Sequence, residues 1–177
     1  DLHEAAYVLD SSARYFPAAT IFVAVVDPGV GTARRPLLVV TRAQHFYVGP
    51  DNGIFTHVLE REGLQAAYVL QQSTYFLNCV SATFHGRDIF APLAAELAAG
   101  QIQPAILGPA VSELVPGWLD EPTFTAGQVS GAVVTIDHFG NLLTNIDAGL
   151  LVGMSNPVVR AGGHDIALRR TYADVRP

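Results

Sequence analysis

Three short segments of this chain place glycine beside charged or imidazole side chains, a combination that is unusual in a packed core and typical of loops that contact ligands. They are residues 27–35, 83–90 and 137–146. The first two segments supply a carboxylate, a guanidinium and an imidazole from Asp27, Arg34 and His85, which together could bind and polarise one water molecule. The third supplies the ring of Phe139 and the amide of Asn141, a pair that suits a flat heterocycle.

Each of these residues, taken alone, also has a purely structural interpretation. Asp27 opens an Asp-Pro-Gly turn directly after an apolar run, and Arg34 could be a solvated loop arginine. His85 lies just before a predicted helix, where the dipole favours a neutral imidazole, but a lone histidine there is more often a cap or a packing residue. Segment 137–141 could be a plain hairpin turn, and segment 49–53 (Gly-Pro-Asp-Asn-Gly) is first a turn and helix cap, and only second a ligand loop. Only the occurrence of these segments together in one chain favours a ligand-binding or catalytic site.

The composition argues against several classes of protein. With 177 residues, half of them hydrophobic, the chain can form one domain with a substantial core, or one domain and a small appendage. The formal net charge is −6, and no basic cluster is larger than an arginine pair, which argues against nucleic acid as a partner. All 10 basic residues are arginine, so a Schiff-base lysine and a P-loop lysine are excluded.

A metal centre, a membrane span and an oxidising compartment are not expected either. Cys79 is the one cysteine, so no internal disulfide or multi-cysteine zinc site can form, which fits a reducing cytosol. Four histidines have no partner at metal-ligand spacing: His45, His57, His138 and His164. No apolar run reaches the roughly 18 residues of a membrane span, and no signal peptide is visible. We therefore expect a cytoplasmic protein with no metal and no membrane contact.

The first two thirds of the chain have the pattern of an α/β domain. The continuous apolar run at 20–26 is typical of a strand buried on both faces, and it ends directly at Asp27. Further strands are expected at 36–41, 45–48 and 66–70, and helices at 3–15, 52–61 and 88–99. The pattern predicts an α/β fold, with an N-terminal α/β domain at residues 1–122 built around a central, mostly parallel sheet.

Proline and glycine mark a linker between about residues 108 and 122, after which the composition changes. Alternating segments rich in Val, Ile and Thr then predict short strands at 128–136, 142–146, 156–160 and 165–170. We expect a small all-β, barrel-like C-terminal domain at residues 123–177. Roughly fifty residues and four strands are few for a stable barrel, so this domain should be incomplete, with a neighbouring subunit covering its apolar surface.

The motifs of this chain, in their order, resemble the S-adenosylmethionine hydroxide adenosyltransferase family, the adenosine-forming SAM hydrolases, which is related to the SAM-dependent fluorinase and chlorinase. The resemblance runs from Glu4-Ala-Ala-Tyr-Val-Leu9 across essentially the whole chain. Its other motifs are Val26-Asp-Pro-Gly-Val-Gly-Thr32, Val48-Gly-Pro-Asp-Asn-Gly53, Thr83-Phe-His-Gly-Arg-Asp-Ile-Phe-Ala-Pro92, Asp137-His-Phe-Gly-Asn141 and Thr171-Tyr-Ala-Asp174.

The resemblance implies an N-terminal α/β domain, a C-terminal β-barrel, and a homotrimer with its active sites between subunits. It implies a water-activating set at Asp27, Arg34 and His85, and no metal or redox cofactor, because the sulfonium of SAM is already an activated leaving group. It also implies substrate-binding residues: Phe84 and Gly86 bordering the reacting carbon, Phe139 and Asn141 holding the adenine, and Asp137 receiving the methionine ammonium.

Two departures from the family pattern concern the ends of the chain. The family opens with a strand and a Thr-Asp-Phe-Gly segment, and it closes with an Asn-Ser-x-Gly-Tyr-like segment, neither of which is present here. The resemblance therefore implies a fragment that is truncated at both ends.

Three functions are compatible with these observations. The first is hydrolysis of SAM to adenosine and methionine by in-line attack of water or hydroxide on the ribose C5′, with either Asp27 or His85 taking the proton. The second is attack by a halide, which is disfavoured because a carboxylate repels an anion and the halogenases have a tyrosine where this chain has Asp27. The fluorinase also has a serine where this chain has Gly86. The third is a catalytically silent nucleoside-binding or assembly module.

Overall fold

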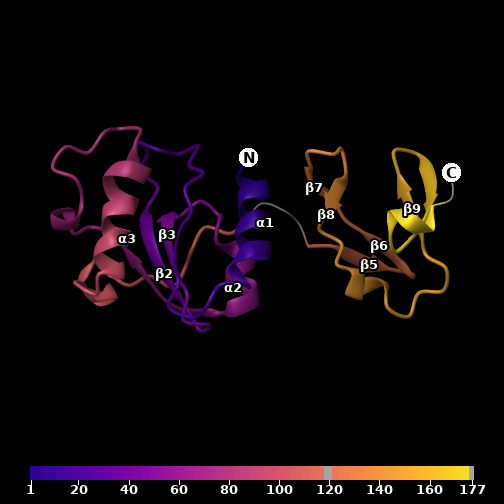
Figure 1. The fold of residues 1–177 in the computed structure, drawn as a ribbon, viewed down its shortest axis with the longest axis horizontal. Coiled ribbons are helices and arrows are strands. Elements are labelled where there is room, and N and C mark those ends of the chain that lie inside the picture. The colour runs from indigo at the N-terminus through magenta and orange to yellow at the C-terminus, as the bar shows by residue number, and fades with distance from the viewer. Residues whose placement is uncertain (118–120, 176–177) are drawn as a thin grey trace. The chain divides into compact units, whose positions relative to one another are not determined.

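The computed structural model describes residues 1–117 and 121–175, so part of the predicted linker and the last two residues of the chain lie outside the described residues. The chain divides into two compact units, Asp1–Leu119 and Asp120–Pro177. Each unit is a separate assembly of strands and helices, as Figure 1 shows.

The first unit is built on a four-stranded sheet with the strand order β1-β3-β2-β4. Its strands are β1 (Ile21–Val23), β2 (Pro36–Thr41), β3 (Phe46–Pro50) and β4 (Leu64–Val69). β1 pairs with β3 in parallel, whereas β2 pairs with both β3 and β4 in antiparallel register. β2 is therefore a central strand, and its apolar sequence is buried almost throughout.

The prediction of a mostly parallel sheet is wrong, because two of the three strand pairs in the described sheet are antiparallel. A tight turn that includes Gln44, at φ 63°, joins β2 directly to β3 and makes the two antiparallel. The crossover through α2 (Thr56–Glu62) then brings β4 to the far side of β2. Three strands thus run in one direction, but β2 runs against them and separates β3 from β4.

The strand predicted at 20–26 is also shorter and more exposed than expected. β1 ends at Val23, which is 46% exposed, because β1 forms an edge of the described sheet. The three residues after Val23 follow β3 without forming a strand: the Ala24 N–H donates to the Val48 carbonyl at 3.0 Å. The end of β3 therefore lies against the segment that leads to Asp27.

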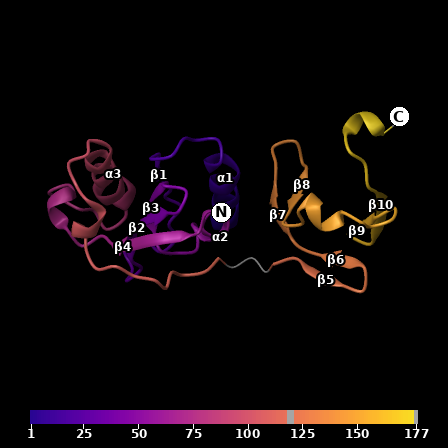
Figure 2. The ribbon, with the colours of Figure 1, turned by 90° about the horizontal axis from the view of Figure 1, so that it is seen from below.

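Helices cover both faces of the sheet. Leu38 and Val40 of β2 pack in a cluster with α3 (Ala91–Ala98), and the alternate residues Leu37 and Val39 pack in a second cluster toward α1 (Leu2–Ala13) and α2. Figures 1 and 2 show α3 on one side of the strands, with α1 and α2 on the other. A π-helical turn, Gly86–Phe90, leads into α3, and short 3₁₀ turns occur at Ser73–Tyr75 and Pro104–Ile106.

In its described residues, the second unit consists of three antiparallel strand pairs, visible in Figure 2. They are β5 (Thr123–Thr125) with β6 (Gln128–Ser130), β7 (Val133–Ile136) with β8 (Leu142–Thr144), and β9 (Val158–Ala161) with β10 (His164–Ala167). Two 3₁₀ turns, Ala148–Leu151 and Tyr172–Asp174, complete it.

The predicted barrel is not confirmed by this unit. Within the described residues no ladder joins the three strand pairs, and Val134 is the one buried hydrophobic side chain. The single strand expected at 128–136 is divided at Gly131, where any side chain would overlap Asn145 and Ile146. Strands of three or four residues expose too little apolar surface on one face to close a barrel of their own.

Candidate active site

Two loops of the first unit meet beside the edge of the sheet. The loop between β1 and β2 carries Asp27 and Arg34, and the loop before the π-helical turn ends at His85. Gly31 makes their approach possible, because its φ of +80° suits glycine and a Cβ there would lie 2.9 Å from the Ala82 carbonyl oxygen. The glycine-rich sequence of the first loop therefore has a steric reason.

Arg34 lies at the centre of the resulting cluster. Its Nε donates to Asp27 Oδ1 at 3.1 Å and to Oδ2 at 2.9 Å, and its Nη2 also donates to Oδ2. The same Nη2 lies 2.7 Å from His85 Nδ1, and the guanidinium carbon lies 5.4 Å from the centre of the Phe90 ring. The side chains of Arg34 and Asp27 are only 9% and 5% exposed. The structure thus brings together all three residues predicted to activate water.

The structure overturns one of the structural alternatives, that for Arg34, whereas those for Asp27 and His85 hold in part. Arg34 is largely buried and so is not a solvated loop arginine. The Asp27 side chain bonds across the loop to Arg34, whereas its backbone carbonyl closes the local turn with Val30. His85 occupies the N-cap position, but its side chain makes no capping hydrogen bond.

The hydrogen bond between Arg34 and His85 defines the tautomer of the imidazole. A guanidinium can only donate, so His85 Nδ1 must carry a lone pair and the ring proton must reside on Nε2. In this arrangement the imidazole of His85 presents an N–H at Nε2.

Asp88, which is fully buried, secures the loop that leads to His85. Its carboxylate accepts hydrogen bonds from Arg87 Nε at 2.6 Å and from the Ser81 N–H at 2.8 Å. These bonds, the one from Arg87 first, hold the pKa of the Asp88 carboxyl below its usual range. Because a π-helical turn is uncommon and often marks a functional site, its place directly after His85 supports the assignment of the site here.

Asp88 should contribute to stability in a pH-dependent way. A carboxylate with a lowered pKa in the fold stabilises fully above its unfolded value of about 3.9, and loses that contribution as the pH falls through the folded value. We expect Asp88→Asn to lower the melting temperature at pH 7, and the gap to wild type to shrink below about pH 4. Asp165→Asn, which alters the exposed pair with Arg160, is the control and should change the melting temperature far less. A gap that stays constant from pH 7 to pH 3 would contradict this role.

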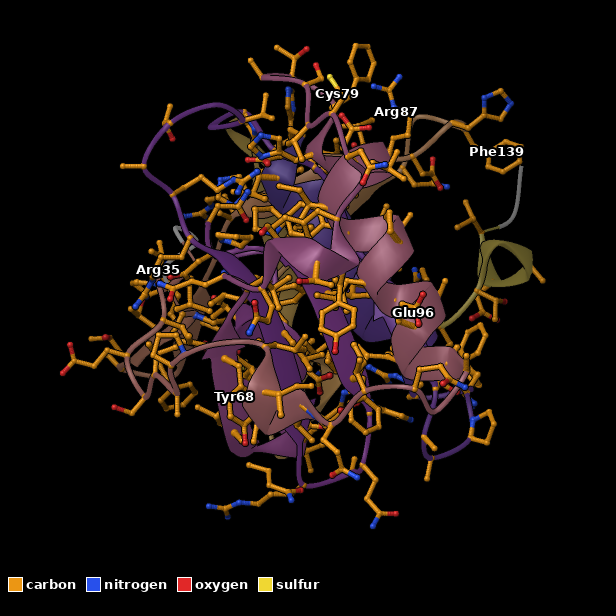
Figure 3. The ribbon with its side chains drawn as sticks, turned by 90° about the vertical axis from the view of Figure 1, so that its left-hand side faces the viewer. Arg35, Tyr68, Cys79, Arg87, Glu96 and Phe139 are labelled. Atoms are coloured by element: carbon orange, nitrogen blue, oxygen red, sulfur yellow. The ribbon has the colours of Figure 1, made fainter. Side chains whose placement is uncertain are left out.

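Phe84 and Gly86 flank His85 in sequence and lie at the surface of the same region. Phe84 is 58% exposed, and the guanidinium carbon of Arg87 lies 4.9 Å from the centre of its ring. Arg87 and the free Cys79 lie at the same end of the unit, as Figure 3 shows. A Cβ on Gly86 would lie 3.5 Å from Val25 Cγ1, an ordinary contact, so local packing does not require glycine at this position.

The remaining predicted site residues lie in the second unit, on the turn between β7 and β8. Asp137 Oδ1 accepts the N–H groups of Phe139 and Asn141, both at 2.8 Å, and Oδ2 accepts Asn141 Nδ2 at 2.8 Å. Hydrogen bonds from Asn141, first its side chain and then its backbone, hold the pKa of Asp137 below its usual range. Phe139 is 84% exposed. The hairpin interpretation thus describes the turn itself, and the roles of these residues toward a ligand stay predictions.

Outside the predicted site, the described residues form a hollow but neither a cluster of metal-ligating side chains nor a membrane-spanning helix. Within the described residues, no group of three or more His, Cys, Asp or Glu side chains is arranged to hold a metal ion, and no helix is long and apolar enough to cross a membrane. A hollow of about 290 Å³ contains none of the predicted site residues. It is lined by Asp51, Gly53, Phe55, Thr56, Leu59, Glu60, Leu114, Val115 and Pro116.

Both parts of the chain match models of one protein family. Residues 1–108 match the SAM hydroxide adenosyltransferase N-terminal domain, and residues 131–177 match the C-terminal domain of the same family. The chain belongs to the SAM hydroxide adenosyltransferase family.

The relatives of this family member include hydrolases and halogenases. The chain is 38% identical over 182 residues to the (R)-S-adenosyl-L-methionine hydrolase of Thermus thermophilus, covering 99% of this chain and 68% of that protein. It is 40% identical over 185 residues to the hydrolase of the same name from Salinispora arenicola, covering 100% and 67%. The fluorinase of an Actinoplanes species is more distant, at 31% identity over 172 residues, covering 82% and 57%.

A solved structure supports the fold of this family member. The crystal structure of an uncharacterized conserved protein from Thermotoga maritima matches with a TM-score of 0.90 and 34% identity, covering 99% of this chain and 70% of that one. The chain thus spans about two thirds of the length of these relatives.

Sequence reasoning missed the role of segment 49–53 in this family member. The segment was expected to cap the following helix, but α2 begins at Thr56 after Phe55, which makes no side-chain cap. The side chain of Asn52 donates instead to the Val26 carbonyl, next to Asp27. The paired Asp and Asn between two glycines were the available signal, since such residues often bond to nearby backbone.

Proposed function

We propose that this protein hydrolyses S-adenosyl-L-methionine to adenosine and L-methionine by attack of water on the ribose C5′. The observation that carries this proposal is the largely buried cluster of Asp27, Arg34 and His85, which can hold and deprotonate a water molecule. The hydrolase relatives, 38% and 40% identical over nearly the whole chain, support the same substrate.

The protein must activate the attacking oxygen but not the leaving group, because the sulfonium of SAM is already an activated one. Attack forms the O–C5′ bond while the C5′–S bond breaks, and its electron pair returns to sulfur, so that the sulfonium becomes the neutral thioether of methionine. Water is a weak nucleophile and must lose a proton during attack. Alignment of water, C5′ and sulfur in one site could lower the barrier by several kcal/mol, up to about 7–11 in ideal intramolecular systems.

The hydrogen bonds of the cluster support Asp27 as the proton acceptor. His85 Nδ1 already accepts from Arg34, and Nε2 carries its proton, so the imidazole is poised to donate to the water oxygen rather than to deprotonate it. Asp27 keeps lone pairs beyond those that Arg34 uses, because a carboxylate has about four acceptor positions. Arg34 holds both partners in place.

The substrate contacts and the assembly are part of the proposal. Phe84 and Gly86 would border the reacting carbon, Phe139 and Asn141 would hold the adenine, and Asp137 would receive the ammonium of methionine. The sparse core of the second unit supports association into a homotrimer, since a neighbouring subunit would cover its exposed hydrophobic side chains. The protein would act in the cytoplasm without a cofactor.

Isotope-labelled water offers a direct test of this function. Incubation of the protein with SAM in ¹⁸O-water should yield equal amounts of adenosine and methionine, with the label in the 5′-hydroxyl of adenosine. Label at that position identifies water as the nucleophile and C5′ as the carbon attacked. Adenosine without the label, or no adenosine at all, would contradict the proposal.

A halogenase is the second candidate, because fluorinases are among the relatives. The negative charge of Asp27 opposes it, since a halide at the same place would be repelled. Repeating the incubation in fluoride or chloride should therefore give adenosine and no 5′-halogenated nucleoside. Binding of SAM without its conversion to any product would instead indicate a catalytically silent binding module.

Substitution of two glycines should separate a role at the substrate from a role in the fold. Gly86→Ala should leave the melting temperature nearly unchanged, because its Cβ would make only an ordinary contact. It should lower the rate of adenosine formation about 10-fold, because the methyl group would displace the reacting carbon. Gly31→Ala should instead destabilise the fold by about 1–3 kcal/mol, because of its positive φ and the nearby Ala82 carbonyl. Full activity of Gly86→Ala would remove Gly86 from the site.

A further inference from the structure

Two consecutive residues directly after β3 hold both ends of the loop that carries Asp27 and Arg34. Asn52 Nδ2 donates to the Val26 carbonyl at 2.9 Å, on the residue before Asp27. The Asp51 N–H donates to the Arg35 carbonyl at 2.9 Å, on the residue after Arg34.

The side chains strengthen this attachment. The Asp51 carboxylate accepts Arg35 Nε at 2.7 Å, and its other oxygen accepts the Val115 N–H at 2.9 Å. The Asp51 side chain is only 3% exposed, so its position is well constrained. Asn52 Oδ1 in turn accepts the Ile54 N–H at 3.3 Å, which orients the amide toward Val26.

The end of β3, directly before Asp51 and Asn52, is itself packed tightly against the start of the loop. A side chain at Gly49 would overlap the Ala24 carbonyl, so only glycine allows this approach. The loop between Val26 and Arg35, by contrast, contains Gly29 and Gly31, whose backbones are intrinsically free. A rigid support thus holds a segment that would otherwise sample many conformations.

We infer that Asp51 and Asn52 are positioning residues for the water-activating cluster. They fix the peptide groups next to Asp27 and Arg34, so that carboxylate and guanidinium meet in the geometry that also reaches His85. Neither side chain bonds to Asp27, Arg34 or His85 in the described hydrogen bonds, so both act through the loop. The consequence for catalysis rests on the proposed function, whereas the attachment of the loop does not.

Asn52→Asp tests the attachment with a minimal change. The acceptor for Ile54 remains, but the donor to Val26 is replaced by an oxygen that faces the carbonyl oxygen of Val26. Gln101→Glu is the matched control, because it makes the same amide-to-carboxylate change where an exposed amide donates to the Ala99 carbonyl. Changes at Asp51 are less suitable, since they would leave the Arg35 guanidinium without its carboxylate partner and remove the hydrogen bond from the Val115 N–H.

Steady-state kinetics with SAM should show a loss in kcat. We expect Asn52→Asp to lower kcat by roughly 10-fold or more, since a small misplacement can cost that much, with KM changed far less. Gln101→Glu should leave both constants unchanged. In an Asp27→Asn background, Asn52→Asp should cost little further, because its effect passes through Asp27. An equal loss in that background, or an unchanged kcat beside a lowered melting temperature, would overturn the positioning role.

Hydrogen exchange separates this inference from the proposed function, because it needs no substrate. Asn52→Asp should speed the exchange of backbone amides between residues 29 and 34 and leave those of α3 unchanged. Unchanged exchange in the loop would overturn the attachment whether or not the protein hydrolyses SAM. If the loop of Asn52→Asp exchanges faster but the wild-type protein forms no adenosine, the attachment stands and only the hydrolase function is rejected.

Discussion

Asp27→Asn should lower the rate of adenosine formation from SAM by about 100-fold or more, the usual size of general-base assistance. The substitution keeps the shape of the side chain and the acceptor for Arg34 Nε, but it removes the charge and the acceptor for a water proton. SAM affinity should change far less, since Asp27 is not expected to contact the adenine or the methionine. The measurement is single-turnover formation of adenosine at saturating SAM.

His85→Ala is the companion variant. It removes the N–H that we expect to orient the water oxygen, and it leaves Arg34 Nη2 without its bond to Nδ1. We expect a loss similar to that of Asp27→Asn, and a double variant that is little worse than either single one, because the residues act as a unit. Near-normal rates for both single variants would show that the cluster does not activate water.

Arg34→Leu should strongly lower both the stability of the protein and its activity. It would leave the Asp27 carboxylate, whose side chain is 5% exposed, without its partner, and removal of one member of a buried pair costs about 3–5 kcal/mol. Activity should be lost, since both Asp27 and His85 depend on Arg34 for their orientation. Urea unfolding followed by circular dichroism measures the change in the free energy of unfolding.

The double variant Asp27→Asn with Arg34→Leu provides the control for this effect. Removal of both charges should recover part of the lost stability, because no uncompensated carboxylate remains. It should recover none of the activity. If Arg34→Leu were as stable as the wild type, the pair would be too well solvated to hold the cluster together.

Much of the local structure follows from the sequence because its causes are local. The apolar residues at 36–41 predict a strand, and the structure places alternate residues of β2 in two different clusters. Gly63, with φ of 72°, directly follows α2, at the position where a glycine commonly ends a helix. The types and order of Asp27, Arg34 and His85 also indicate water activation, and the motifs around them indicate the family.

The order of the strands in the sheet and the tertiary contacts could not be predicted in the same way. Nothing in the periodicity of β2 and β3 shows that β2 lies between β3 and β4, because strand order depends on which faces pack together. The cap expected at segment 49–53 failed for a similar reason: Asn52 has several possible backbone partners, and packing against Val26 decides between them.

The sequence by itself therefore determined the family and most of the secondary structure and indicated the candidate reactive groups, since these depend on residue type and short-range spacing. Only the tertiary structure decided how the groups interact. Arg34 and His85 are separated by 51 positions, and the hydrogen bond between them assigns the ring proton of His85 to Nε2. The attachment of the loop that carries Asp27 and Arg34 to Asp51 and Asn52 is likewise a tertiary contact. Hydrogen-bond direction and burial depend on neighbours in space, which residue spacing along the chain does not specify.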